Sequence, residues 1–273
     1  MLRERLISAA ILIPLVVAGV LYLPAEWFAF VLGMIIMGAA WEWSALIPLE
    51  GNNMRVAYLV ITAAALVQVW LAGIQATAVS ILLWVALAWW VCAMLWISRP
   101  GLGSGHLLSG RIFKALLGVL LLVSAWSALL RLHARPETGP QLVLFLMILI
   151  WVADSGAYFA GRKWGTRKLA PAVSPGKTWE GVYGALIACS VFAVASAFLL
   201  HTTGARITAF VAVCIVTILF SIVGDLQESL LKRQVGIKDS GSLIPGHGGI
   251  LDRIDSLIAA GPVFLLGLEW MRL

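Results

Sequence analysis

Long apolar runs recur from one end of the chain to the other, and they limit its possible folds more than any other feature. Each run approaches the roughly 20 residues that a helix needs to cross the hydrocarbon core of a bilayer. Lipid cannot satisfy exposed backbone groups, so each run is predicted to be a helix. The sequence lacks the ten-residue alternation of membrane barrels. The nine predicted spans are residues 6–23, 27–48, 55–73, 78–98, 112–132, 141–160, 182–201, 206–223 and 255–271.

The composition agrees with a membrane location. Only 12% of the 273 residues are charged and 62% are hydrophobic, whereas about a quarter of the residues of a soluble domain are charged. We therefore predict an all-α, polytopic integral membrane protein with about nine transmembrane helices and two polar cytoplasmic loops. Glu42 and Gln68 interrupt the second and third runs, so these two spans carry the weakest signal.

The basic residues predict which side of the membrane each loop faces. If the chain changes sides at every span, fifteen of the nineteen Lys and Arg fall on the side of the N-terminus. Cytoplasmic loops carry such an excess. The N-terminus and the polar loops 161–181 and 224–254 are therefore predicted to face the cytoplasm, in a bacterial-type inner (cytoplasmic) membrane. The net charge of +6 then belongs to these loops, and because no basic run is interleaved with aromatic residues, we predict no nucleic-acid partner.

A polar segment divides the chain into two predicted parts. Residues 99–110 contain Pro100 and four glycines, which is typical of a hinge. Residues 1–110 are expected to form N-terminal transmembrane helices that act as scaffold, dimer surface or lipid-facing wall. Residues 111–273 are expected to form a C-terminal catalytic bundle with the active-site loops, because the candidate chemistry lies beyond about residue 150.

A dense polar stretch, residues 224–256, interrupts the apolar background. From Asp225 the pattern becomes helical, and Asp225, Lys232 and either Glu228 or Ser229 fall on one face. Carboxylates of this kind suit Mg²⁺, which binds one or two of them together with substrate phosphates. A surface network of salt bridges is the plainer alternative. The acids are Asp225, Glu228, Asp239, Asp252 and Asp255, and the basic residues are Lys232, Arg233, Lys238 and Arg253.

Glycines and one histidine lie within the same stretch. Gly248 and Gly249 allow the backbone to approach a ligand closely, and Asp252 and Asp255 lie three residues apart at the predicted start of the next helix. His247 could be a general base, a phosphate donor or a turn residue. One histidine without a second ligand does not indicate a metal site.

An acidic residue also interrupts the sixth predicted span. Asp154 lies on the same helical face as Tyr158 and Gly161. An ionisable residue in a span is costly and is a site candidate by default. A hydrogen bond to a neighbouring helix is the plainer explanation.

The loop 169–181 contains residue types that handle phosphate, namely Ser174, Lys177 and Thr178. A P-loop is excluded because position 171 is proline where that motif needs glycine, and no strand is predicted before it. We predict instead a turn that leads into a helix, with Thr178 or Ser174 as its cap. Such a helix start either binds an anion or is an ordinary capped terminus.

The stretch 229–255 resembles the signature of the phosphatidate cytidylyltransferases, also called CDP-diacylglycerol synthases. Its pattern is S-x-L-K-R-x4-K-D-x-G-x2-I-P-x-H-G-G-I-x-D-R-I-D, without a departure from the family's signature. Residues 174–181 and the surroundings of Asp154 resemble the family as well, whereas the N-terminal half carries little specific similarity.

The resemblance implies that the chain uses CTP and phosphatidic acid to make CDP-diacylglycerol and pyrophosphate. It also implies Mg²⁺, with K⁺ beside it in some members, and a membrane homodimer. Carried over, Asp225 and Asp252 are the leading metal ligands, and Asp239 and Asp255 are nearby carboxylates. The residues expected to hold phosphates are Lys177, Lys232, Arg233, Lys238 and Arg253, with Ser174 in the nucleotide site. Further candidates are Asp154, Thr178, Gly248 and Gly249 for nucleotide or phosphate binding and His247 for catalysis.

Two other functions were open to a membrane protein of this kind. A CDP-alcohol phosphotransferase is excluded because that class needs an Asp-Gly-x-x-Ala-Arg segment, and this sequence has no Asp-Gly pair. A secondary transporter with intramembrane acidic ion sites is the alternative that remains. Such a transporter would show broken helices in two inverted halves, whereas the acids here gather in one half of the chain.

Overall fold

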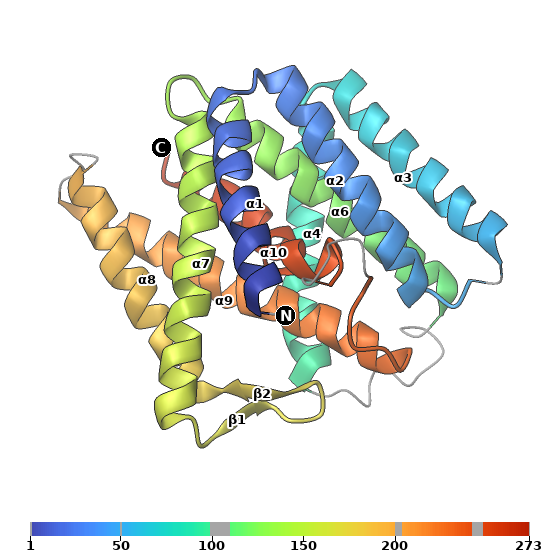
Figure 1. The fold of residues 1–273 in the computed structure, drawn as a ribbon. Helices are drawn as coiled ribbons and strands as arrows, with labels where there is room; N and C mark the ends of the chain where they lie inside the picture. Colours follow the sequence, from blue (N-terminus) through green and yellow to red (C-terminus); the bar gives the residue numbers. More distant parts are fainter. Residues whose placement is uncertain (1, 50, 99–109, 200–203, 242–247, 273) are drawn as a thin grey trace.

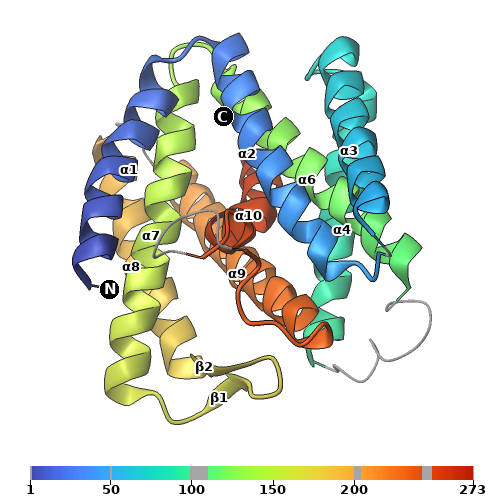
Figure 2. The ribbon, with the colours of Figure 1, turned by 45° about the vertical axis from the view of Figure 1, so that its right-hand side comes forward.

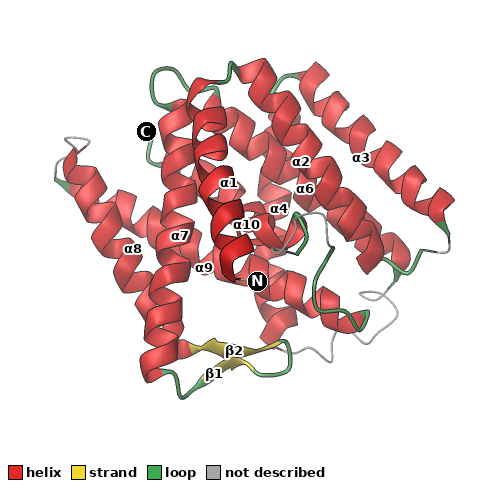
Figure 3. Ribbon diagram, in the orientation of Figure 1, coloured by secondary structure: helices red, strands yellow, loops and turns green. Residues whose placement is uncertain are grey.

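The computed structural model describes residues 2–49, 51–98, 110–199, 204–241 and 248–272. Within these residues the chain forms nine α-helices and one short β-hairpin (Figures 1 and 3). The helices are α1 (Leu2–Tyr22), α2 (Ala25–Leu46), α3 (Asn52–Ala72), α4 (Thr77–Ser98), α6 (Arg111–His133), α7 (Gly139–Trp164), α8 (Trp179–Leu199), α9 (Ala205–Gln234) and α10 (Leu251–Trp270). The strands are β1 (Lys168–Ala170) and β2 (Ser174–Thr178).

The helices confirm the all-α, polytopic membrane architecture. Each predicted span coincides with one described helix, and seven of these helices are long and apolar enough to cross a membrane. The seven are α2, α3, α4, α6, α7, α8 and α9. In α10, Asp252, Arg253 and Asp255 add charge to the first two turns, which lowers its apolar character. The division of the chain at residue 110 stays a prediction, and residues 99–109 lie outside the described part.

Two local predictions were wrong. The span predicted to end at residue 223 continues without a break to Gln234, so Asp225 lies inside the 30-residue helix α9 and not at a new helix start. The loop before α8 forms an antiparallel hairpin, in which Lys168 pairs with Thr178 and Ala170 with Ser174. Ser174 is therefore a strand residue and not a helix cap.

Helix α6 lies at the centre of the bundle. It packs against α2, α3, α4, α7 and α10, and most of its side chains from Leu117 to His133 are buried. Because lipid tails are as apolar as the helix surfaces, close packing through small residues is what holds membrane helices together. Helices α7 and α8 pack along their length, and a methyl group added at Gly156 would collide with the backbone oxygen of Gly184.

A second close approach joins α9 to α10. Gly224 lies so near α10 that a methyl group there would come within 2.6 Å of the backbone oxygen of Asp255 and 2.9 Å of the Cβ of Ala259. This approach places Asp225, the next residue of α9, beside the first two turns of α10. The packing of two apolar helices thus brings together residues of the polar stretch.

The polar parts of the chain gather at one end of the bundle. In Figures 1 and 2 the start of α1, the hairpin and the C-terminal end of α9 lie toward the lower end. The connection between α6 and α7 and the C-terminal end of α10 lie toward the opposite end. This arrangement puts loops 161–181 and 224–254 on the same side, as their charges predict.

Candidate active site

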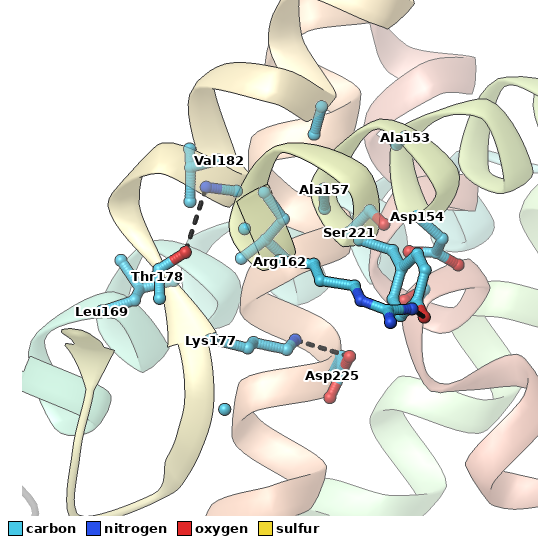
Figure 4. A pocket seen from close by; sticks show the side chains of 17 residues that line it. Ala153, Asp154, Ala157, Arg162, Leu169, Lys177, Thr178, Val182, Ser221 and Asp225 are labelled. Atoms are coloured by element: carbon cyan, nitrogen blue, oxygen red, sulfur yellow. Dashed lines mark hydrogen bonds and ion pairs between the residues drawn. The ribbon is translucent and has the colours of Figure 1, made fainter. Parts of the chain in front are cut away.

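A cavity of about 390 Å³ opens between α7, α8, α9 and the hairpin (Figure 4). Apolar side chains form part of its wall, including Ala153, Leu169 and Val182. Its polar lining comes from four elements, one of which, α10, contributes Ser256. The other polar residues are Asp154, Tyr158 and Arg162 from α7, Lys177 and Thr178 from β2, and Ser221 and Asp225 from α9.

An ion pair crosses the cavity from the hairpin to α9. The Nζ of Lys177 lies 2.5 Å from Oδ2 of Asp225, and both side chains are partly exposed (Figure 4). The hydroxyl of Ser229, one turn further along α9, donates to Oδ1 of Asp225 over 3.4 Å. The predicted shared face of Asp225 and Ser229 is therefore confirmed.

Thr178 fixes the hairpin to the start of α8. Its Oγ1 accepts a hydrogen bond of 3.2 Å from the N–H of Gly181, which is the contact of a helix N-cap. The prediction of Thr178 as a cap is therefore confirmed. Glu180 holds the same region from the other side, because its carboxylate accepts bonds from the backbone N–H groups of Thr166 and Arg167. Lys177 thus extends from a hairpin whose two ends are held by the start of α8.

Asp154 and an arginine that the sequence reasoning missed line the same cavity. Arg162 donates from Nη1 to the hydroxyl of Tyr158 over 2.8 Å, and its guanidinium lies 5.9 Å from the centre of that ring. The three residues share one face of α7, as predicted for Asp154 and Tyr158. Arg162 follows Tyr158 by four residues, which is about one helical turn. This spacing was the sequence signal that Arg162 shares the face of Tyr158.

A second polar cluster joins α9 to α10. The Nζ of Lys232 lies 2.6 Å from Oδ1 of Asp252 and 3.3 Å from Oε1 of Glu228. Asp252 also accepts the backbone N–H of Ser240 at 3.1 Å and that of Gly249 at 2.9 Å. Asp252 precedes the predicted span 255–271. Burial disfavours its ionised form, but Lys232 and the N–H of Gly249 outweigh burial and lower the pKa of Asp252 to about 2.

A small void lies beneath this cluster, between α2, α4, α9 and α10. It has a volume of about 10 Å³ and is lined by Glu228, Gln227, Trp90 and Asp255, among others. Nε2 of Gln227 and Nε1 of Trp90 are buried without a hydrogen-bond partner in the described part of the chain, whereas Glu228 has Lys232 as its ion-pair partner. Asp255 lines this void and Asp225 lines the main cavity, although the two helices touch at Gly224.

The remaining predicted residues lie around these two clusters. Arg233 donates from Nε to the backbone oxygen of Val173 over 3.5 Å, which links α9 to the hairpin turn. Gly248 has a φ of +80°, a conformation that favours glycine and is expected at a tight turn. Lys238, Asp239 and Arg253 are exposed, and Ser174 is partly exposed in β2 but does not line the cavity. His247 lies outside the described residues.

Glu42 of α2 is a further site residue that the sequence reasoning missed. In the sequence Glu42 interrupts an apolar span. In the structure it is buried and accepts hydrogen bonds from Ser240, Ile250 and Leu251. The sequence signal for Glu42 was its position inside a predicted span. An acid there is costly unless it pairs with a cation or accepts hydrogen bonds.

The carboxylates of the site supply few of the ligands that a divalent ion needs. Within the described residues no group of three or more His, Cys, Asp or Glu is arranged to hold a metal. Mg²⁺ needs only one or two carboxylates when substrate phosphates supply other ligands. Asp225 meets this requirement, since it faces the cavity and has a cation as its partner. The oxygens of Asp252 are already occupied by Lys232 and two backbone N–H groups.

Comparison with known proteins gives a match across nearly the whole chain. The model of the cytidylyltransferase family matches residues 3–271. A protein of Pseudomonas aeruginosa named phosphatidate cytidylyltransferase is 43% identical, over 97% of this chain and 96% of its own. A protein of Haemophilus influenzae with the same name is 38% identical over 97% of both chains. A Brucella suis protein, again with that name, is 39% identical over 64% of this chain and 61% of its own.

Proposed function

Because the chain belongs to the cytidylyltransferase family, we propose that it is an integral membrane phosphatidate cytidylyltransferase. It transfers CMP from CTP to phosphatidic acid and produces CDP-diacylglycerol and pyrophosphate. The observation that carries the proposal is the match to proteins of this name over 97% of the chain. A cavity with a lysine, an arginine and two carboxylates supports it, because two highly charged phosphate compounds must meet there.

The reaction needs no nucleophile from the protein. An oxygen of the lipid phosphate attacks the α-phosphorus of CTP, a new P–O bond forms, and the bond to the β-phosphate oxygen breaks as pyrophosphate leaves. Phosphoryl-type transfers of this kind depend on positioning and on neutralising charge. Lys177 from β2 and Arg162 from α7, which both line the cavity, hold phosphate oxygens in line and offset their charge.

The second cluster completes the proposed site. Lys232, Arg233, Lys238 and Arg253 contribute positive charge on the α9–α10 side, where Gly248 and Gly249 let the backbone approach a phosphate. Asp154, Ser174 and Thr178 border the nucleotide on the hairpin side. Asp239, Asp255 and His247 are further residues of the proposed catalytic region.

The proposed cofactor is Mg²⁺, with K⁺ as a second ion. Asp225 and Asp252 are the proposed ligands, and when bound the ion would neutralise the phosphates and the leaving group. Asp225 would exchange its contact with Lys177 for the ion, which frees Lys177 for phosphate. Asp252 could join only by exchanging Lys232 in the same way.

The proposed setting is a bacterial inner membrane with the site on its cytoplasmic side. CTP is a cytoplasmic compound and phosphatidic acid lies in the leaflet, so a site at the membrane border serves both. The fifteen-to-four distribution of cations supports this orientation. We also propose a homodimer. The transporter alternative is not favoured, because the family match covers residues 3–271 and the cavity acids lie at one end of the bundle.

Incorporation of labelled CTP into lipid tests the proposal. The purified protein in detergent is incubated with α-³²P-labelled CTP, Mg²⁺ and phosphatidic acid, and the lipid is then extracted. Label is expected in the lipid fraction, and it should disappear when phosphatidic acid is replaced by diacylglycerol, which lacks the attacking phosphate. Failure of folded wild-type protein to label lipid would overturn the proposed function.

A further inference from the structure

Glu42 of α2 is a buried acid that the reaction described above does not use. Its exposed fraction is 3%. Its carboxylate accepts the N–H of Ile250 at 3.0 Å, the N–H of Leu251 at 2.7 Å and the hydroxyl of Ser240 at 3.0 Å. All three donors lie in or beside the signature stretch. A residue of the second helix therefore holds the last helix and the loop before it.

These bonds cap the start of α10. The first N–H groups of a helix have no acceptor within the helix, and here the N-cap residue Ile250 makes no side-chain cap bond. Glu42 supplies the missing acceptor from another helix, and a negative charge is favoured at that end of the helix dipole. The burial of the acid is therefore compensated by donors that would otherwise be unsatisfied.

The same loop is bound to Asp252 from its other side. Ser240 donates its hydroxyl to Glu42 and its backbone N–H to Asp252. Gly249 donates its N–H to Asp252, and the next residue, Ile250, donates to Glu42. Ser240 thus contacts both carboxylates, while the neighbouring residues Gly249 and Ile250 contact one carboxylate each. A shift of one carboxylate would therefore also move donors of the other.

Glycines make this arrangement possible. A Cβ at Gly241 or at Gly249 would collide with the Glu42 carboxylate. A Cβ at Gly248 would lie 2.9 Å from Oδ2 of Asp252. The backbone therefore closes directly on both acids, which leaves the loop little freedom to move while both are in place.

We infer that Glu42 is a positioning residue, which fixes Asp252 and the turn at residues 248–250 against α9 without touching substrate. Its effect on turnover rests on the proposed function, since that proposal gives Asp252 its role. The main cavity is built mainly from α7, α8, α9 and the hairpin, with Ser256 of α10, and Glu42 contacts none of its lining residues in the described contacts. Loss of Glu42 should therefore lower kcat more than it raises the KM for CTP.

The variant Glu42→Gln tests the inference in the full-length protein. Glutamine keeps the shape but replaces one acceptor oxygen with an NH₂ group that faces other donors. Hydrogen–deuterium exchange of the backbone amides of Ile250 and Leu251 should become about 10- to 100-fold faster, as expected when bonds to a charged acceptor are lost. Exchange in the hairpin should stay unchanged. The matched control is Glu26→Gln, which changes an exposed acid of the same helix.

Kinetics give the second readout. In folded Glu42→Gln protein, kcat should fall about tenfold or more while the KM for CTP stays within about twofold, the pattern of a lost transition-state interaction. Unchanged exchange at the amides of Ile250 and Leu251, or kcat and KM both at wild-type values, would overturn the inference. So would an equal loss in Glu26→Gln.

A third variant covers the case in which Glu42→Gln does not fold. Ser240→Ala removes one donor to Glu42 and leaves both carboxylates in place. Faster exchange at Ile250 and Leu251 with a lower kcat would support the inference, and wild-type exchange and kcat would overturn it. The exchange experiment needs no substrate. If the wild-type protein transfers no CMP, the proposed function fails, while the exchange result still decides whether Glu42 holds the loop.

Discussion

The Nζ of Lys177 and Oδ2 of Asp225 lie 2.5 Å apart inside the main cavity. The pair connects a two-stranded hairpin to the middle of a membrane helix, and 48 residues separate the two in sequence. In the proposed reaction Lys177 would exchange this contact for a phosphate, and Asp225 would then be free to hold a divalent ion. The ion pair thus holds the two charged side chains close to the positions where the substrates and the ion would bind them.

Replacing Lys177 with alanine should mainly impair the binding of CTP. Loss of a charged hydrogen bond to phosphate corresponds to roughly 1.5–3 kcal/mol, or about a 10- to 100-fold rise in the KM for CTP. Initial rates at varied CTP measure the effect. Lys168→Ala, an exposed lysine in β1 of the same hairpin, is the control and should leave the KM near the wild-type value. An unchanged KM in Lys177→Ala with a normal rate would remove this lysine from the nucleotide site.

Replacing Asp225 with asparagine should abolish turnover without unfolding the protein. Asparagine is nearly the same shape but neutral, so the proposed ion loses a charged ligand, and a loss of at least about 100-fold in kcat/KM is expected. Lipid labelling at varied Mg²⁺ measures the effect, and size-exclusion chromatography checks folding. Asp252→Asn should abolish turnover as well. Full activity in both variants would contradict the metal assignment. Glu137→Gln, a change in the connection between α6 and α7, is the control.

Chelation should abolish the wild-type reaction, and added Mg²⁺ should restore it. The cavity contains carboxylates, substrate phosphates would lie beside them in the proposed reaction, and an ion that neutralises both is the proposed reason why the reaction proceeds. Lipid labelling after treatment with EDTA and then with excess Mg²⁺ measures the dependence. Undiminished labelling in EDTA would exclude a divalent cofactor.

Replacing Gly224 with alanine should force α9 away from α10. The added methyl group would meet the backbone oxygen of Asp255 at 2.6 Å, and backbone cannot move aside as a flexible side chain can. Overpacking of this kind typically costs about 1–3 kcal/mol, so both the apparent Tm and the activity should fall. Gly33→Ala in α2 is the control, because its added methyl group would lie no closer than 3.6 Å to a neighbour. A wild-type Tm in Gly224→Ala would contradict this account of the helix contact.

Replacing Arg131 with methionine should lower stability and leave the KM for CTP unchanged. Its Nε lies 2.8 Å from Oε1 of Glu269, and its Nη1 donates to the hydroxyl of Ser80 at 2.8 Å, so it joins α6, α10 and α4. Breaking a partly buried pair should cost about 1–3 kcal/mol, less than for a fully buried one. Thermal unfolding in detergent measures the loss. A changed KM would show that this contact is coupled to the cavity.

The helices could be predicted from the sequence because length and hydropathy are properties of single segments. Each apolar run became a helix, and the helical spacing of Asp225 and Ser229 placed them correctly on one face. The hairpin could not be predicted in this way. Its strands are three and five residues long, and their pairing depends on Glu180, which binds the backbone before β1 from the start of α8.

The site was predicted as a set of residue types, but not as a set of contacts. Asp225 and Asp252 were expected to share an ion because both belong to the signature stretch. In the structure each has its own lysine, Lys177 and Lys232, and only the folded chain decides which cation faces which acid. Glu42 was missed for the same reason, since its donors Ile250 and Leu251 follow 208 and 209 residues later.

The distance along the chain between Glu42 and Ile250 has a consequence for biosynthesis. A ribosome that has produced helices α1 to α9 has made Glu42, Lys177 and Asp225, but the donors that Glu42 needs do not yet exist. Until the final helix is inserted, that buried acid lacks its hydrogen bonds and Asp252 has not been made. The nascent protein therefore stays incomplete at its chemical centre until the start of α10 has been made.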